Sequence, residues 1–362
     1  MTVPLTRDRL MPAPQMRGAD LRQTGLDPNY WYPVCRSKDV KSGIPKPVTF
    51  AGEPIVLVRC QSGKLFALED RCAHRQVPLH AGVVRGEALQ CGYHGWTYGA
   101  DGRCLAVPYL AQGVPMPKGV KSYPAREAYG YVFIIPGSAK ADDVPFPAVP
   151  AFGDARYKTR HLDRRVDCHY SFMHENLMDM NHQFLHRRLM GRIRTTVLGF
   201  RTSETTVEAD YSFKRTAGGK PIGERFIIGV HKGQDLMTIT TDYPYQTLRY
   251  WPAGAKAPAL DLWTVYIPLD RAQRTNHTFG LMSIMRPKKA PWLINMMWPF
   301  IVWFTDGIFA EDRAIVEMEQ RAHDNQGADW NQELFPAIRA LKELLQTRGV
   351  PPAEDIRPDS PG

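Results

Sequence analysis

The chain has 362 residues, of which 43% are hydrophobic, 23% charged and 10% aromatic. This composition excludes a disordered or fibrous protein, and the length allows two domains that each bury a core. The net charge of +9 suits an acidic partner, but no dense block of lysine and arginine favours nucleic acid. We therefore expect an acidic protein partner or ordinary solubility, and no binding to nucleic acid.

The first 28 residues carry charges and have no apolar centre, so they differ from a secretory signal peptide. We expect residues 1–28 to form a flexible extension before a domain that opens near YWYPVC. A cytoplasmic protein is expected on the same ground. Disulfides are rare in a reducing compartment, so paired cysteine and histidine spacings are considered first as metal sites.

Residues 29–140 are expected to form a small all-β domain. Short β-type segments such as PVTF, IVLVRC, KLFALED and YVFII are separated there by glycine-containing turns. The segment 136–154 contains several prolines and shows no periodicity, which indicates an irregular crossing between domains.

Residues 141–362 are expected to form the second domain. A helical stretch covers about 168–190, and long β-type runs such as TTVEADYSFKR, ERFIIGVHKG and LWTVYIPL fill about 195–285. Leu334, Ile338, Leu341 and Leu345 then recur at helical spacing, and Gly349 ends that run. A block of strands between helices predicts an α+β domain, an antiparallel sheet covered by helices.

The most apolar run, APWLINMMWPFIVWF, covers residues 290–304. It is too short to span a membrane, and Asn295 and Pro299 interrupt it, so we expect no transmembrane segment. We predict a buried helix, or one whose aromatic side chains line an apolar pocket. A surface that meets a membrane or a lipophilic substrate is the alternative.

Two cysteine–histidine pairs lie in the all-β domain. Cys72 and His74 form a C-x-H pair, and Cys91 and His94 form a C-x-x-H pair after sixteen intervening residues. These ligands could hold one tetrahedral zinc, or a two-iron cluster in which two histidines replace two cysteines on one iron. Each pair mixes a cysteine with a histidine, which favours the cluster, because each loop can then serve both irons.

The run HENLMDMNHQFLH, residues 174–186, predicts a second metal site. On one continuous helix, Glu175, Asp179, His182 and His186 would form a single polar stripe. Two histidines and a carboxylate form the facial triad of non-haem Fe(II) oxygenases. Asp179 lies too near His182 to be the third ligand, so we predict that it accepts a hydrogen bond that fixes the His182 tautomer.

Both motifs resemble those of the Rieske non-haem iron oxygenases. The segment CAHR…PL…CGYHGW is similar to the Rieske [2Fe–2S] fingerprint, and NLMDMNHQFLH is similar to the iron-site helix of that family. In the family a distant aspartate completes the triad, within a segment that resembles E-D-x-x-x-x-E. FAEDRAIVEMEQ, residues 309–320, fits this pattern at Asp312, with Glu311, Glu317 and Glu319 as competing carboxylates.

The resemblance covers nearly all of the chain from about residue 30, and it implies a role for each matched residue. The cluster ligands would be Cys72, His74, Cys91 and His94. The ligands of a mononuclear Fe(II) would be His182, His186 and Asp312, with the amide of Asn176 beside the iron. Asp179 matches the carboxylate that links an iron-bound histidine to a Rieske histidine of the neighbouring subunit in a head-to-tail homotrimer.

The resemblance also implies the fold and the activity. The fold would be a Rieske domain joined to a helix-grip-like catalytic domain, and the chain an α-only terminal oxygenase. It would hydroxylate or oxidatively dealkylate a hydrophobic, aromatic small molecule. The chain has no G-x-G-x-x-G after a strand, so an external reductase or ferredoxin would supply electrons. Ring cis-dihydroxylation, a Rieske electron carrier without oxygenase activity and a structural zinc protein are the alternatives.

Overall fold

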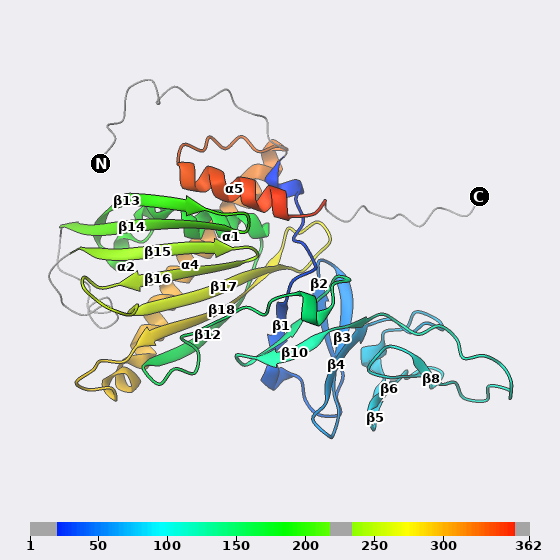
Figure 1. Cartoon of the computed structure of the whole chain (residues 1–362). Helices are drawn as coiled ribbons and strands as arrows, with labels where there is room; N and C mark the ends of the chain where they lie inside the picture. The colour runs from blue at the N-terminus through cyan, green and yellow to red at the C-terminus, as the bar shows by residue number, and fades with distance from the viewer. Residues whose placement is uncertain (1–19, 218–233, 352–362) are drawn as a thin grey trace.

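The computed structural model describes residues 20–217 and 234–351 (Figure 1). Three small antiparallel sheets occupy the N-terminal part of the chain, and one seven-stranded antiparallel sheet with helices packed on it follows. The predicted α+β class, with a β-rich first part and a sheet-based second part, is confirmed. Among the described residues, the segment between these parts holds only the short 3-10 turn Ala141–Asp143.

The strands of the first part form three sheets, ordered β1-β11-β10, β2-β3-β4-β9 and β5-β6-β7-β8. Their bounds are β1 Tyr32–Arg36, β2 Lys46–Phe50, β3 Glu53–Arg59, β4 Leu65–Glu69, β5 Val83–Arg85, β6 Ala88–Gln90, β7 Thr97–Tyr98, β8 Cys104–Ala106, β9 Ser122–Tyr123, β10 Ala125–Ala128 and β11 Tyr131–Ile134.

Two separate cores divide these strands into an inner and an outer group. Side chains of β1 and β11 share one core with the large sheet, and the Tyr131 hydroxyl donates to the carbonyls of Leu162 and Gly280 there. A second core contains Cys72 and Cys91 and belongs to β3, β4 and the β5–β8 lobe. In Figure 1 this lobe projects away from the large sheet, at the far side of the molecule from α2 (Arg187–Met190).

The large sheet has the order β12-β18-β17-β16-β15-β14-β13. Its strands are β12 Tyr157–Val166, β13 Arg192–Thr202, β14 Thr206–Ala217, β15 Asp235–Asp242, β16 Tyr245–Trp251, β17 Leu260–Pro268 and β18 Asn276–Met285. β17 is buried along almost its whole length, because the α-helices cover one face and the inner strands contact the other. The whole of the predicted strand ERFIIGVHKG, residues 224–233, lies outside the described residues.

The predicted helix over 168–190 is not continuous. α1 (Tyr170–Met178) ends at Asp179, the 3-10 turn η6 (Met180–Phe184) follows, and α2 comes after it. The Asp179 carboxylate accepts a hydrogen bond from the Asn181 backbone N–H at 2.8 Å and so caps the new turn. An aspartate can satisfy free backbone donors in this way, which competes with continuing the helix.

Two further helices cover the sheet, α4 (Leu293–Gln326) and α5 (Pro336–Arg348). The predicted C-terminal helix is confirmed: Ile338, Leu341 and Leu345 are buried, and Gly349 is its C-cap. The prediction that Leu334 belongs to this helix is wrong, since Leu334 is exposed and precedes the helix.

The prediction of a flexible extension over residues 1–28 is wrong for residues 20–28, which are folded. Residues 1–19 lie outside the described part of the chain. Leu21 and Leu26 are buried in the main core, and the Gly25 N–H donates to the Val350 carbonyl at 2.6 Å. A charged, proline-containing stretch can thus still supply two apolar anchors. The N-terminal boundary of the folded part therefore lies at or before residue 20.

The run 290–304 is helical but does not have the predicted burial. It forms the first turns of α4, which continues through Pro299 to Gln326. By length and composition α4 is the one helix among the described residues that could cross a bilayer, although its C-terminal half carries many charges. Arg160 and Arg164 of β12 pair with Asp306 and tie the helix to the sheet.

Candidate active site

The two cysteine–histidine loops close in the same way. The Cys72 N–H donates to the Val77 carbonyl at 2.9 Å, and the Cys91 N–H donates to the Trp96 carbonyl at 2.8 Å. In each loop the cysteine carbonyl also accepts a bond from the residue four positions later, at 2.9 Å and 3.2 Å. Equivalent hydrogen bonding therefore gives the two loops the same closed shape.

The loops bring like ligands together. The thiol groups of Cys72 and Cys91 are buried and interact with each other, while the rings of His74 and His94 are exposed, with centroids 4.6 Å apart. One thiol pair and one imidazole pair fit a two-iron cluster with differently ligated irons better than one tetrahedral zinc. The donor set of this structure therefore fits a [2Fe–2S] cluster.

Two glycines allow this close approach. A Cβ at Gly92 would lie 2.8 Å from the Ala81 carbonyl oxygen, so a larger residue would push the second loop away from the turn Leu79–Ala81 that follows the first loop. Gly95 has φ +72°, a left-handed conformation that glycine adopts without strain. The spacing in CGYHGW is therefore needed for backbone geometry as well as for ligation.

Sequence reasoning assigned no role to two residues beside this site, Tyr98 and Trp96. The Tyr98 hydroxyl accepts a bond from the Ala73 N–H at 3.1 Å, so its proton is free for the Cys72 sulfur, also at 3.1 Å. Hydrogen bonds to cluster sulfurs are one of the factors that set the reduction potential. The Trp96 ring stacks on His74, with centroids 4.8 Å apart, and holds that imidazole in place. Neither contact has a signal in ligand spacing alone.

Backbone and carboxylate acceptors fix both histidines of the second site. His182 Nδ1 lies 2.6 Å from the backbone carbonyl oxygen of Asp179, and His186 Nδ1 lies 2.8 Å from Glu311 Oε2. Each Nδ1 therefore carries the proton, and each Nε2 is left with a free lone pair. The prediction that the Asp179 carboxylate orients His182 is wrong, because the carbonyl oxygen does so and the carboxylate caps η6.

Glu175 is not part of this site, contrary to the predicted polar stripe. The break at Asp179 turns η6 relative to α1, and Glu175 pairs with Arg22 at 2.5 Å. The sequence offers Glu311 as a competing metal ligand. In the structure its carboxylate instead contacts His186 Nδ1, the ring nitrogen that does not face Asp312.

Asp312 of α4 meets the two histidines. Its Oδ1 lies 3.1 Å from His186 Nε2 and 4.0 Å from His182 Nε2, and one ligand atom from each residue falls within 4.8 Å of the others. Metal–ligand bonds of about 2.1 Å place neighbouring ligand atoms about 3 Å apart, which matches the Asp312–His186 pair, whereas His182 Nε2 lies farther out. His186 Nε2 and Asp312 Oδ1 are buried without a well-aligned hydrogen bond, which is costly unless a cation binds there.

The local electrostatics agree with a cation. Burial lowers the pKa of His186, but Asp312 and Glu311 more than offset this effect and raise the pKa above its ordinary value. These carboxylates thus favour positive charge at the ring, whether a proton or a metal ion supplies it. Two histidines and one carboxylate are the donor set of mononuclear non-haem iron.

A cavity of about 560 Å³, its open mouth included, adjoins Asp312. Most of its walls are apolar, with contributions from Leu162, Val166, Met173, Leu177, Leu262 and Phe309. Asn176 also lines it, as the sequence prediction of an amide beside the metal requires. The aromatic residues of 290–304 do not line this cavity.

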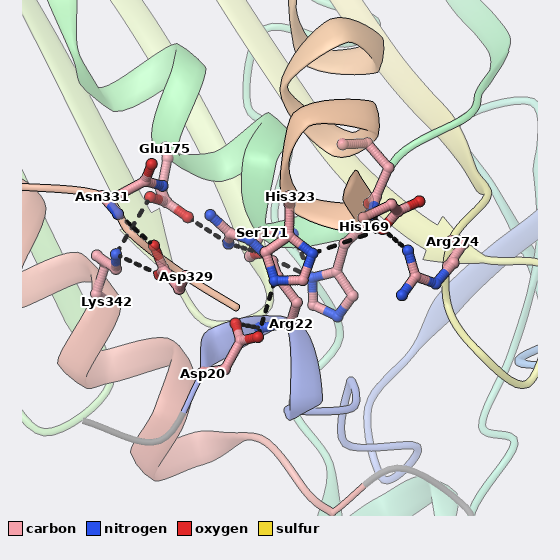
Figure 2. Close-up of polar contacts among 12 residues, drawn as sticks. Asp20, Arg22, His169, Ser171, Glu175, Arg274, His323, Asp329, Asn331 and Lys342 are labelled. Atoms are coloured by element: carbon pink, nitrogen blue, oxygen red, sulfur yellow. Dashed lines mark hydrogen bonds and ion pairs between the residues drawn. The ribbon is translucent and has the colours of Figure 1, made fainter. Parts of the chain in front are cut away.

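A buried polar network supports α1 from behind (Figure 2). Arg22 contacts Ser171 and Glu175, and its guanidinium stacks on the Phe172 ring 3.5 Å from the centroid. Lys342 of α5 pairs with Asp329 at 3.1 Å and lies 3.9 Å from Glu175. The N-terminal segment and α5 thereby fix the helix that leads into Asp179 and His182.

Glu319 adds a third carboxylate to this network, beside Glu175 and Asp329, which faces the two cations Arg22 and Lys342. Burial and the nearby charge of Glu175 together raise the pKa of Glu319 to about 7, although Arg22 acts to lower it. The unfolded chain ionises Glu319 near pH 4.5, whereas the folded protein keeps the proton until about pH 7. Stability from this group is therefore fully present below pH 4.5 and is lost as the pH rises to 7.

We expect Glu319→Gln to remove this loss. The variant should match the wild type near pH 4.5 and be more stable at pH 8 by at most about 3 kcal/mol, a rise in Tm of about 5 °C. Thermal unfolding of the holoenzyme at both pH values measures the difference. Glu87→Gln, at a side chain 51% exposed, is the control. Parallel pH profiles of Glu319→Gln and wild type would contradict the prediction.

Known proteins resemble both parts of the chain. Residues 30–124 match the Rieske [2Fe-2S] domain, and residues 166–338 match the vanillate O-demethylase oxygenase C-terminal domain. A 4beta-methylsterol monooxygenase of Methylococcus capsulatus is 30% identical over 343 residues, which cover 91% of this chain and 90% of that protein. The chain belongs to the Rieske oxygenase family.

Other comparisons agree with this assignment. The vanillate O-demethylase oxygenase subunit of a Pseudomonas species is 34% identical over 179 residues, 45% of this chain and 46% of that protein. The fold is that of dicamba monooxygenase bound to dicamba, with a TM-score of 0.72, 22% identity and coverage of 89% and 98% of the two chains. This Rieske oxygenase is thus an enzyme with a [2Fe–2S] cluster and a mononuclear iron.

Proposed function

We propose that this Rieske oxygenase is a monooxygenase that hydroxylates an apolar, methyl-bearing small molecule and thereby starts its oxidative demethylation. The observation that carries the proposal is the largely apolar cavity beside Asp312, within a chain similar over nine-tenths of its length to a methylsterol monooxygenase. Apolar walls bind such a substrate through burial of its surface, and Asn176 supplies a polar group to orient it.

The metal ligands are assigned in the same proposal. Cys72, His74, Cys91 and His94 hold the cluster, and His182, His186 and Asp312 hold the iron. Bound ferrous iron supplies the O₂ activation and the cluster supplies electrons. The Asp179 carbonyl and the Glu311 carboxylate hold the two Nδ1 atoms, which leaves each Nε2 facing Asp312.

We further propose that electrons pass between subunits of a head-to-tail homotrimer. Three features support this arrangement: the outer lobe lies far from α2 in Figure 1, the His74 and His94 rings are exposed, and exposed side chains follow the half-buried Asp179 along the chain. Asn181, Phe184 and Arg187 form that exposed surface. His94 of one subunit would then donate to the Asp179 carboxylate of the next.

An external reductase or ferredoxin supplies the electrons in this family, and the net charge of +9 would favour an acidic donor. We place the protein in the cytoplasm, where such donors operate.

A reconstituted assay tests the proposed function. The purified protein should contain acid-labile sulfide, the cluster irons and one further iron. With a surrogate reductase and ¹⁸O₂, methylsterols should give an alcohol that carries one labelled oxygen atom. Methoxyarenes should give the unlabelled phenol, because the oxygen from O₂ leaves in the formaldehyde. A cis-diol would instead indicate a ring dioxygenase. Full metal content without oxygen incorporation into any of the panel would favour an electron carrier.

A further inference from the structure

The N-terminal half of α4 presents an apolar stripe to solvent. Trp292, Met296 and Trp303 are 64%, 62% and 63% exposed, and Pro299 between them is exposed as well. Their spacing of four, three and four residues places them on one face of the helix, at its start and over the following turns. We define these four residues as the α4 stripe. Two exposed tryptophans on one helix face are unusual for a soluble surface and indicate a binding site.

The charges around the α4 stripe are basic. No charged residue occurs from 290 to 305, and Lys288 and Lys289 are exposed directly before the helix. Lys158 of β12 lies over the Trp298 ring, 4.5 Å from its centroid, and donates to Asn295 at 2.8 Å. Asp306, the first acidic residue after the stripe along the helix, is already paired with two arginines.

This combination fits an anionic lipid surface. Tryptophan rings favour the boundary between headgroups and acyl chains, and lysines beside them are attracted to anionic headgroups. A second copy of the chain fits less well. In the proposed trimer the neighbour docks near Asp179 and the iron, whereas Trp292 precedes Asp312 by 20 residues, about 30 Å along the helix.

The stripe is also continuous with the active site through α4. Asp306, one turn after Trp303, pairs with Arg164, which itself lines the cavity and lies 5.6 Å from the Phe309 ring centroid. Phe309 lines the same cavity, and Asp312 follows one turn later. One helix thus carries the exposed stripe, a wall of the cavity and a proposed iron ligand.

We propose that the α4 stripe is a peripheral membrane-docking surface for bilayers that contain anionic phospholipid. Docking would bring the cavity close to the phase in which an apolar substrate dissolves. This part of the inference rests on the proposed function, whereas docking itself can be measured without turnover. A failure of one is therefore distinguishable from a failure of the other.

Vesicle co-sedimentation of the holoenzyme tests the proposal. We expect binding to vesicles of phosphatidylcholine with about one quarter phosphatidylglycerol, and weaker binding to phosphatidylcholine alone. Trp292→Ser combined with Trp303→Ser should lower the partition coefficient at least about tenfold. Lys288→Glu combined with Lys289→Glu should lower it for the anionic vesicles by about fivefold per lysine or more.

Trp330→Ser is the matched control, because Trp330 is 70% exposed but lies outside the α4 stripe. Its partition coefficient should equal that of the wild type. Absence of wild-type binding to anionic vesicles, or equal binding of the stripe variant, would overturn the proposal. A stripe variant that loses subunits in sedimentation velocity would also overturn it, since the stripe would then be an interface between copies of the chain.

Discussion

Asp312→Asn is expected to purify with the cluster irons and labile sulfide but without the mononuclear iron. The substitution keeps the size of the side chain and removes the charge that faces His182 and His186 across 4.0 Å and 3.1 Å. Loss of a metal ligand should cost more than the ten- to hundredfold in affinity that a supporting contact is worth. We therefore expect turnover to fall by more than about a hundredfold. Iron analysis together with EPR of the reduced cluster measures both parts.

Glu311→Gln is the matched control for Asp312. The glutamine carbonyl can still accept the hydrogen bond from His186 Nδ1, which the Glu311 carboxylate accepts at 2.8 Å. Its loss of iron affinity should stay near tenfold, the size expected of a supporting contact. If Glu311→Gln lost the iron and Asp312→Asn kept it, the two neighbouring carboxylates would have to exchange roles.

The two metal sites differ in how much of them could be predicted from the sequence. Cys72 and His74 share one short loop, as do Cys91 and His94, and local hydrogen bonds fix each loop. Spacing therefore contains most of that geometry. Asp312 lies 126 residues after His186, and only a family motif could pair them.

The failures have two physical causes, which are competition from non-local partners and a local cap that interrupts the helix. Glu175 was placed on the metal face by helical periodicity, but Arg22, 153 residues earlier, binds it on another side. Asp179 breaks the helix because its carboxylate finds a nearer donor in Asn181. The run 290–304 is helical as predicted, yet its environment depends on what covers each face, and periodicity alone does not contain that information.

Asp179→Asn is expected to keep both metals and to slow electron transfer between them. An asparagine oxygen can still cap the Asn181 N–H, and the carbonyl oxygen of residue 179 still orients His182. Only the negative charge that would accept a bond from the neighbour's His94 is lost. A charge-assisted hydrogen bond is worth about 1.5–3 kcal/mol, so reoxidation of the cluster should slow by about ten- to a hundredfold.

Stopped-flow mixing of reduced holoenzyme with substrate and O₂ measures that step directly. Asp242→Asn, an exposed aspartate at the end of β15, is the control and should reoxidise at the wild-type rate. Loss of the mononuclear iron in Asp179→Asn would show that the Asp179 carboxylate serves to hold the turn η6 and its iron ligand His182 in place. A wild-type rate with both metals present would remove Asp179 from the electron path. The proposed head-to-tail contact would then have to place another group between His94 and His182. Within the described part of one subunit, the carboxylate that His182 contacts is that of Asp312, a proposed iron ligand.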